Sequence, residues 1–234
     1  MPEQKKFDLS PSVAILVAGA TIAGAILLTH FFPAAKGATA AQGNEQPTLQ
    51  QQMSPALYLA MAKELGADET KYQACVDAKK HQAKIDADSA EAQKAGGQGT
   101  PFTVFVDTKT KKQLAVSGAL PYEQLKLAVD AINTEGVPLS IRPPSATDHI
   151  IGAPDSPIVM VEFSDFQCPY CQMIHPSLQK LAAESNGKIA WVYRNFPLYT
   201  IHPQATPAAN AAECIAEQLG NDAFWKFADA IFEG

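Results

Sequence analysis

The chain of 234 residues predicts an α/β fold. Apolar runs of strand length alternate with segments of helical periodicity through most of the sequence, a pattern typical of a sheet covered by helices. One such run, Ile158–Phe163, ends just before the motif Cys168-Pro169-Tyr170-Cys171, and the motif itself opens a helical pattern. We therefore expect a central sheet with helices on both faces and the two cysteines at the carboxyl end of a strand.

Helical patterns come first in the predicted domain. Ser54 followed by proline is a helix start, because serine caps the free amides and proline fits the first turn. Helices are expected over Ser54–Leu65 and within Asp68–Ala95. Two β-rich runs then flank a polar turn and predict a hairpin, Phe102–Val106 with Gln113–Ser117. A helix over Tyr122–Ile132 follows the hairpin.

The second half repeats the alternation. The continuous apolar run Ile158–Phe163 predicts a buried strand, and apolar residues at helical spacing predict a helix over Pro169–Glu184. The alternating, aromatic segment Lys188–Phe196 predicts another strand. Alanine-rich helices are expected over Thr206–Gly220 and Asp222–Phe232.

The two cysteines of the Cys-Pro-Tyr-Cys motif lie one helical turn apart. Such a pair can form a small-ring disulfide, and the unpaired amides at the start of the helix stabilise a thiolate on the first sulfur. We expect Cys168 to be the attacking sulfur and Cys171 the resolving one, with Pro169 shaping the helix start. A zinc half-site and a purely structural disulfide are the other interpretations. Zinc would need further ligands, for which the chain offers His175 with Cys75 or Cys214.

A Gly-Thr-Pro step precedes the strand that begins at Phe102. X-Pro before a strand is a frequent position for a cis peptide, so Thr100–Pro101 is expected to be cis, unless Pro101 merely starts the strand. Together with the cysteine motif, this segment resembles the DsbA-like branch of the thioredoxin superfamily. The resemblance implies a thioredoxin-like fold with a helical insertion. It also implies that Thr100 and Pro101 lie beside Cys168 and, with Tyr170, contact an incoming peptide.

The order of the segments differs from that of the family, in which the cysteine motif comes first. Here a cis-proline half, residues 53–136, precedes a linker, residues 137–156, and a CxxC half, residues 157–234. We interpret the domain over residues 53–234 as circularly permuted; two incomplete tandem domains or a shuffled chain would give the same order. The connecting segment 133–156, about two dozen residues, would span roughly 70 to 80 Å if extended, enough to pass around a domain of about 20 Å radius.

Glu162 lies inside the otherwise apolar strand before the motif. A buried carboxylate is costly and acquires a raised pKa that suits proton transfer. The resemblance implies that Glu162 serves Cys171 as a proton shuttle; a glutamate facing water at the strand edge is the alternative. The lysine that the resemblance implies beside this acid is absent, since Trp191 falls near its place, and Arg194 is a candidate substitute.

Three further polar residues flank the motif. Asp165 is expected either to tune Cys168 or to be an exposed loop residue. His175, four residues after Cys171, is expected at the surface or partly buried. His202 lies in an Ile-His-Pro segment that resembles one in the family, which implies a supporting role near the site.

Cys75 and Cys214 lie in helical segments that are expected to pack together. An extracytoplasmic domain can form disulfides, so we expect a second, structural bond between them, with buried free thiols as the alternative.

The N-terminus predicts a location. Residues 11–32 contain no formal charge and follow two lysines, which predicts a single membrane-spanning helix with residues 1–10 in the cytoplasm. Residues 33–52 are expected to form a flexible tether to a domain outside the cytoplasm. A cleaved signal peptide, ending at Ala38-Thr39-Ala40, is the other interpretation.

These features predict a membrane-anchored thiol-disulfide oxidoreductase that acts on cysteines of exported proteins. The family implies a quinone-linked membrane partner that reoxidises the cysteines. No cofactor and no metal are expected, and a net charge of −6 without a basic cluster argues against nucleic acid. A non-catalytic peptide-binding module or a zinc-holding adapter is the alternative function. Oxidase, reductase and isomerase are not distinguished by the sequence.

Overall fold

The computed structural model describes residues 52–145 and 147–233. The expected anchor, residues 11–32, and all but the last residue of the expected tether, residues 33–52, lie outside the described residues. None of the described helices is long and apolar enough to cross a membrane.

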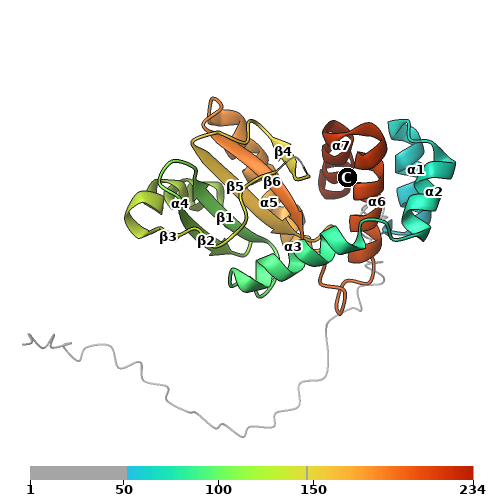
Figure 1. Cartoon of the computed structure of the whole chain (residues 1–234), viewed down its shortest axis with the longest axis horizontal. Helices are drawn as coiled ribbons and strands as arrows, with labels where there is room; N and C mark the ends of the chain where they lie inside the picture. The colour runs from blue at the N-terminus through green and yellow to red at the C-terminus, as the bar shows by residue number, and fades with distance from the viewer. Residues whose placement is uncertain (1–51, 146, 234) are drawn as a thin grey trace, which may run out of the picture. The chain divides into compact units, whose positions relative to one another are not determined.

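A six-stranded sheet forms the centre of the domain, in the order β3-β2-β1-β5-β6-β4. The strands are β1 (Phe102–Asp107), β2 (Lys112–Ser117), β3 (Val137–Pro138), β4 (His149–Ile151), β5 (Ile158–Ser164) and β6 (Ile189–Asn195). β1 pairs antiparallel with both β2 and β5, whereas β5 and β6 are parallel. Both halves of the sequence therefore contribute to one sheet (Figure 1).

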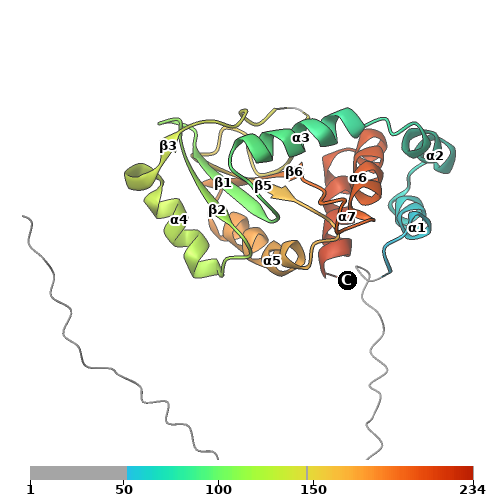
Figure 2. The ribbon, with the colours of Figure 1, turned by 90° about the horizontal axis from the view of Figure 1, so that it is seen from below.

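Seven helices surround the sheet within the described residues. They are α1 (Pro55–Leu65), α2 (Glu69–Asp77), α3 (Gln82–Lys94), α4 (Tyr122–Glu135), α5 (Pro169–Glu184), α6 (Ala205–Leu219) and α7 (Asn221–Glu233). α3 crosses one face, while α4 and α5 cover the other (Figure 2). α1, α2, α6 and α7 cluster beyond the β4 edge (Figure 1). The mixed α/β fold with helices on both faces is thus confirmed.

The elements agree with those expected from periodicity, with one addition. β3 and β4 lie in the segment 137–156 that was expected only as a linker. Strands of two and three residues are too short to produce a periodic pattern. Their pairing with β2 and β6 extends the sheet at both edges.

The sheet separates two apolar layers. On the α5 side, Phe105, Met160 and Trp191 join a large cluster that includes residues of α1, α4, α6 and α7. On the α3 side, Val104, Val161 and neighbouring strand residues form a smaller cluster. Alternate residues of each central strand therefore contribute to different layers, so the face of each strand residue follows from its position.

A buried ionic network anchors the segment before β4. Arg194 of β6 donates to Asp148 at 2.9 and 3.0 Å and to Glu91 at 3.0 Å. Arg142 binds Asp148, Glu91 and Asp88. Burial alone would raise the pKa of Asp148, but the guanidinium of Arg194 outweighs it and holds that pKa below its usual value. Every carboxylate of this network has a cationic partner, as burial requires.

Cys75 of α2 and Cys214 of α6 are joined in a disulfide, with 5.9 Å between their Cα atoms. The bond connects two segments that are 139 residues apart in sequence. It holds the first helices of the domain to α6.

Removing this bond should lower the free energy of unfolding. In a Cys168→Ser/Cys171→Ser background, adding Cys75→Ala and Cys214→Ala is expected to lower the free energy of unfolding by about 4 kcal/mol. The reason is that the bond restricts a long loop in the unfolded chain. The chain has 2 tryptophans, both buried in this domain, so their fluorescence during urea unfolding reports on it. Equal urea midpoints for the variants with and without the Cys75–Cys214 bond would contradict the expectation.

Candidate functional site

The cysteine pair lies at the start of α5, directly after β5. Cys168 is the N-cap residue of the helix and Pro169 occupies its first turn. The amide of Cys171 donates to the carbonyl oxygen of Cys168 at 3.0 Å, which closes the first turn. Both thiols are free, and Cys168 keeps 3% of its surface exposed whereas Cys171 is fully buried. Only Cys168 is therefore placed to meet a partner from solution.

The loop before β1 lies against this pair. The Thr100–Pro101 peptide is cis, as the sequence predicted. The Cys168 thiol donates to the carbonyl oxygen of Thr100 at 3.5 Å. β1 runs antiparallel to β5, so the residues before β1 and those after β5 meet at the same end of these two strands.

The two cysteines have opposite ionisation properties. A hydrogen bond with the side chain of Cys171 makes the largest contribution to the lowered pKa of Cys168, about 6, with further contributions from Thr100 and the amide of Tyr170. Burial raises the pKa of Cys171 well above its ordinary value, and the neighbouring Cys168 adds to this. Near neutral pH the reduced pair therefore holds a thiolate at Cys168 and a thiol at Cys171.

Glu162 of β5 is fully buried and faces α5. Its Oε2 accepts a hydrogen bond from Trp191 Nε1 at 3.1 Å. Burial raises the pKa of this carboxyl, against the charge of His175 and the bond from the indole. The alternative of a water-facing glutamate is wrong. Arg194 does not substitute for the missing lysine, because it lies on the α3 side of the sheet with Glu91 and Asp148.

Asp165 is buried, so its interpretation as an exposed loop residue is wrong. Its carboxylate accepts from the amides of Gln167 and Leu198, each at 2.8 Å, and contacts His202 Nδ1 at 2.7 Å. Its own amide donates to the Cys171 sulfur at 3.5 Å. Asp165 and His202 thus tie the loop before the motif to the loop after β6, which is the supporting position expected for His202.

His175 is also fully buried, whereas the sequence predicted a surface or partly buried side chain. Its Nε2 lies 2.8 Å from Asp229 Oδ1, and its ring packs between Trp191 and Phe232 with centroid distances of 5.0 and 4.9 Å. The sequence analysis missed Asp229, because no local pattern connects a residue of α7 to one in α5. Only the packing of these two helices brings them together.

A groove borders the cis-proline loop. A hollow of about 430 Å³ is lined by Gln98, Thr100, Pro101 and Ser117 among others. A second hollow of about 670 Å³ shares Gln98 and continues between α3 and the loop 196–200. At the start of α5, the side chains of Tyr170 and Met173 are 58% and 63% exposed. The cysteine pair is therefore flanked by both a polar groove and exposed apolar side chains.

Two groups of side chains within the described residues have the spacing of metal ligands. The first is Cys75, His81 and Cys214, but its sulfurs are joined in a disulfide and supply no thiolate. The second is His175, Asp229 and Glu233, with Glu233 exposed. Zinc held by the motif cysteines with Cys75 or Cys214 does not fit this arrangement, because those two cysteines are bonded to each other.

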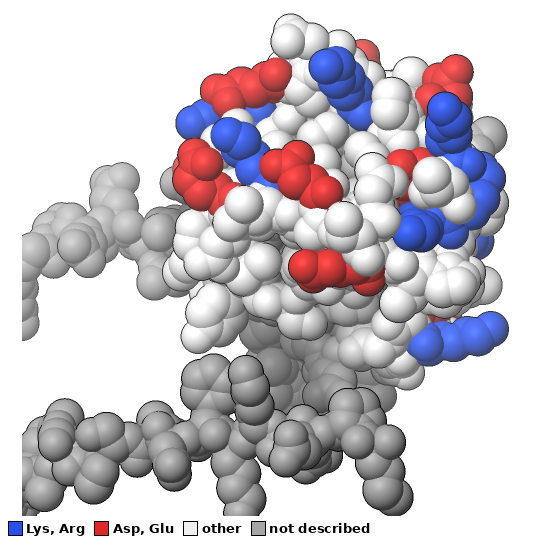
Figure 3. Space-filling model, turned by 90° about the vertical axis from the view of Figure 1, so that its left-hand side faces the viewer, with Lys and Arg blue, Asp and Glu red and all other residues white. Residues whose placement is uncertain are grey.

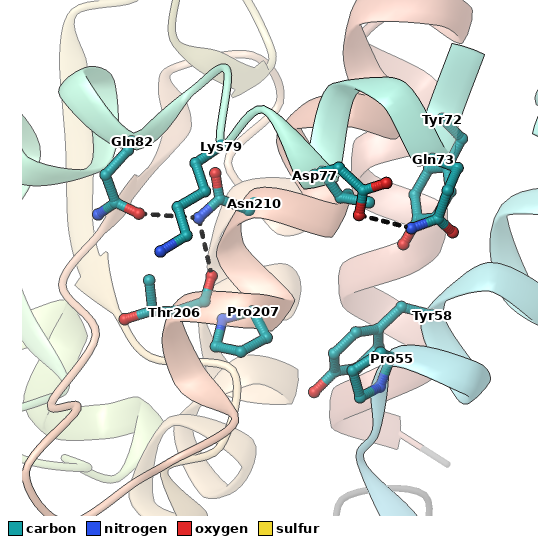
Figure 4. A pocket seen from close by; sticks show the side chains of 11 residues that line it. Pro55, Tyr58, Tyr72, Gln73, Asp77, Lys79, Gln82, Thr206, Pro207 and Asn210 are labelled. Carbon is teal, nitrogen blue, oxygen red and sulfur yellow. Dashed lines mark hydrogen bonds between the residues drawn. The ribbon is translucent and has the colours of Figure 1, made fainter. Parts of the chain in front are cut away.

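A separate cavity of about 350 Å³ lies in the helical insertion. Tyr58 of α1 and Tyr72 of α2 line one side, and Thr206 and Pro207 of α6 line another (Figure 4). Burial raises the pKa of Tyr72 to about 12. Asn210 donates to Gln82 and to the Thr206 carbonyl. None of the residues of the cysteine site lines this cavity.

Comparisons with known families agree with both halves of the site. The family model described as DSBA-like thioredoxin domain matches residues 39–130, which include the cis-proline loop. The family model described as thioredoxin matches residues 144–234, which include the cysteine motif. No solved structure matches the chain.

Curated relatives are matched over short segments only. They include Na⁺/H⁺ antiporter NhaA 3 of Salinispora tropica, 39% identical over 84 residues, and Na⁺/H⁺ antiporter NhaA 1 of Mycolicibacterium gilvum, 36% identical over 85 residues. Each match covers 36% of this chain. The chain spans only 12% and 13% of the length of these two relatives, respectively.

Reduced protein should react with iodoacetamide at Cys168 alone. The rate is expected to rise with pH up to about 6 and then level off, because the thiolate is the nucleophile. The same shift stabilises the folded reduced protein at neutral and higher pH, and this stabilisation is lost as the pH falls through about 6. Peptide mass spectrometry after timed alkylation measures the rate at each cysteine.

Cys171→Ala is the matched variant, since it removes the hydrogen-bond donor that makes the largest contribution to the shift and should move the midpoint upward. A wild-type midpoint near the ordinary value of 9.0, or equal labelling of both cysteines, would contradict the assignment.

Proposed function

Since this chain carries a DsbA-like domain of the thioredoxin superfamily, we propose that it is a thiol-disulfide oxidoreductase that forms or exchanges disulfides in exported proteins. The observation that carries the proposal is the unequal cysteine pair beside the cis-proline loop. Cys168 has a pKa of about 6 and contacts Thr100, while Cys171 is buried with a raised pKa. A purely structural disulfide would not require its two cysteines to differ in pKa and burial.

The proposed reaction begins with the Cys168–Cys171 disulfide. A client thiolate attacks Cys168 Sγ, a mixed disulfide forms, and Cys171 leaves as a thiolate that takes up a proton. A second client thiolate then attacks the client sulfur of the mixed disulfide. This step releases the client disulfide and leaves Cys168 as a thiolate, which its low pKa stabilises. Two electrons pass from the client to the cysteine pair.

Glu162 is the proposed proton donor and acceptor for Cys171. Its carboxyl is buried on the face of the sheet toward α5 and has a raised pKa, so it can hold a proton at a pH where an exposed glutamate cannot. The position of a carboxyl between a buried thiol and the indole of Trp191 supports this role.

The client is proposed to be an extended peptide held beside the cis-proline loop. Thr100 and Pro101 border the groove that continues along α3, and Tyr170 provides an exposed aromatic surface next to Cys168. Backbone groups of the loop would hold the peptide whatever its sequence. On the face of the molecule shown in Figure 3, Asp and Glu side chains lie among the Lys and Arg side chains, and adjoining basic side chains occur only along the right-hand edge.

We further propose that residues 11–32 anchor the protein as a single-pass membrane helix and that the domain lies outside the cytoplasm. The uncharged run and the lysines before it support this, as does the Cys75–Cys214 disulfide, a bond typical of oxidising compartments. A quinone-linked membrane partner would reoxidise the cysteine pair. The halves of the domain are proposed to be permuted, which is supported by their contribution to one sheet.

The oxidised protein should transfer its disulfide to a reduced, unfolded polypeptide. Cys168→Ser and Cys171→Ser, which lack the disulfide, are both expected to abolish transfer. With a disulfide-bonded client, the Cys168 thiolate of Cys171→Ser should attack the client disulfide and accumulate the mixed disulfide, because the resolving thiol is missing. Non-reducing gels and mass spectrometry detect the adduct. The rate per molecule should not change on dilution, since both halves of the site lie in one chain.

Two results would contradict this function. Peptide binding without any transfer would favour the non-catalytic binding module. Stoichiometric zinc on Cys168 and Cys171 in the purified protein would favour the zinc-holding adapter.

The proposed location has its own test. In cells, the full-length chain should remain in the membrane fraction after an alkaline wash, and protease added outside spheroplasts should degrade its domain. A chain that is released by the wash and shortened at the N-terminus would support the cleaved signal peptide, and protection from external protease would contradict the orientation.

A further inference from the structure

Among the buried side chains near Cys171 that retain an unsatisfied polar atom in the described residues, two bear groups other than a hydroxyl. They are Glu162 of β5 and His175 of α5. Within the described part of the chain, Glu162 Oε1 and His175 Nδ1 have no hydrogen-bond partner. An unsatisfied buried polar atom costs about 1 to 3 kcal/mol, so a pair of them in one region calls for a functional reason.

Trp191 contacts both groups. Its Nε1 donates to Glu162 Oε2 at 3.1 Å, and its ring centroid lies 5.0 Å from that of His175. His175 lies one helical turn after Cys171, on the same face of α5. The charge of His175 acts on Glu162 strongly enough to oppose the effect of burial on its pKa. Cys171, Glu162 and His175 therefore share one buried space between α5 and the sheet.

His175 also reaches the surface through α7. Its Nε2 lies 2.8 Å from Asp229 Oδ1, and the Asp229 side chain is 35% exposed. A carboxylate oxygen of Glu233, one turn further along α7, lies within 4.8 Å of a ring nitrogen of His175 and a carboxylate oxygen of Asp229. One ring nitrogen of His175 thus belongs to the buried space and the other contacts a group in touch with solvent.

We infer that His175 and Asp229 carry protons between buried Glu162 and solvent during thiol-disulfide exchange. The inference rests on the proposed function. When Cys171 leaves as a thiolate, Glu162 gives it a proton and becomes a carboxylate. His175, which carries its proton at Nδ1, then takes a second proton at Nε2 from water through Asp229, and the imidazolium so formed returns the Nδ1 proton to Glu162. Reoxidation runs the same transfers in reverse, so protons balance in both directions.

The charges around His175 suit this role. Glu162 faces it from β5, and Asp229 and Glu233 face it from α7, so the ring has carboxyl groups on both sides. From β6 the nearby titratable group is Tyr193, whose pKa burial raises well above its ordinary value, so it stays neutral. On α5 itself the group is Cys171, which is also neutral in the reduced protein at neutral pH. The histidine takes the place of the lysine that this chain lacks.

The first test is the pH dependence of disulfide exchange by the full-length protein. Stopped-flow fluorescence follows the reaction of the oxidised protein with a cysteine peptide, in the presence of a chelator. His175→Gln should slow mixed-disulfide formation by about tenfold and change the shape of its pH profile, because proton supply to Cys171 becomes limiting. Asp229→Asn keeps a hydrogen-bond acceptor at a partly exposed position and should give a smaller change in the same direction.

Asp222→Asn is the matched control, since it removes the same charge from the exposed first turn of α7. Its profile should superimpose on that of the wild type. A purely structural role for His175 would lower the melting temperature without changing the pH profile. Profiles of both site variants that superimpose on the wild type would overturn the inference.

The second test does not need disulfide exchange. The ionisation of Glu162 in the reduced protein is followed by infrared difference spectroscopy of its carboxyl band, assigned with Glu162→Gln. His175→Gln should raise the pKa of Glu162 above its wild-type value, because it removes a group whose charge lowers that pKa. An unchanged pKa in His175→Gln would overturn the proton path.

The two tests separate the inference from the proposed function. A wild-type protein that exchanges no disulfides at any pH would contradict the function. The titration of Glu162 would then still decide, by itself, whether His175 and Asp229 connect this carboxyl to solvent.

Discussion

The antiparallel pairing of β1 with β5 is the contact on which the rest of the structure depends. In this register Phe102 lies opposite Phe163, so the start of β1 is beside the end of β5. The cis-proline loop precedes β1 and the cysteine motif follows β5, and the pairing must therefore bring them to the same edge. This geometry does not depend on which strand comes first in the chain.

The sheet also divides the polar groups into two environments. On the α3 side, Arg194 lies among Asp148, Glu91 and the segment before β4, and each charge there is paired. On the α5 side, Glu162 and His175 are buried with unsatisfied atoms. Register decides this division, because Glu162 opposes Tyr193 while Arg194 opposes Phe163 and points to the other face. Charges that are all paired suit a structural role, whereas buried groups with an unsatisfied atom suit proton exchange.

The helical insertion is held to the sheet by contacts that lie far apart in sequence. The Cys75–Cys214 disulfide joins α2 to α6. Lys84 of α3 and His149 of β4 both bind the buried carboxylate of Glu213 on α6, at 2.6 and 3.0 Å. These partners offset the burial that would otherwise raise the pKa of Glu213, which is lowered to about 2. The insertion thus keeps α6 and α7 in place, and α7 supplies Asp229 to His175.

The sequence by itself determined the type and order of the main elements, the cysteine motif and the cis-proline position. These depend on local periodicity, capping and turn chemistry, which short segments encode on their own. Only the tertiary structure decided which side chains are buried and paired. Packing buries Asp165 and His175, places Arg194 on the opposite face of the sheet from Glu162, and forms the short strands β3 and β4. Each of these outcomes depends on a partner distant in the chain, and local sequence carries no record of such a partner.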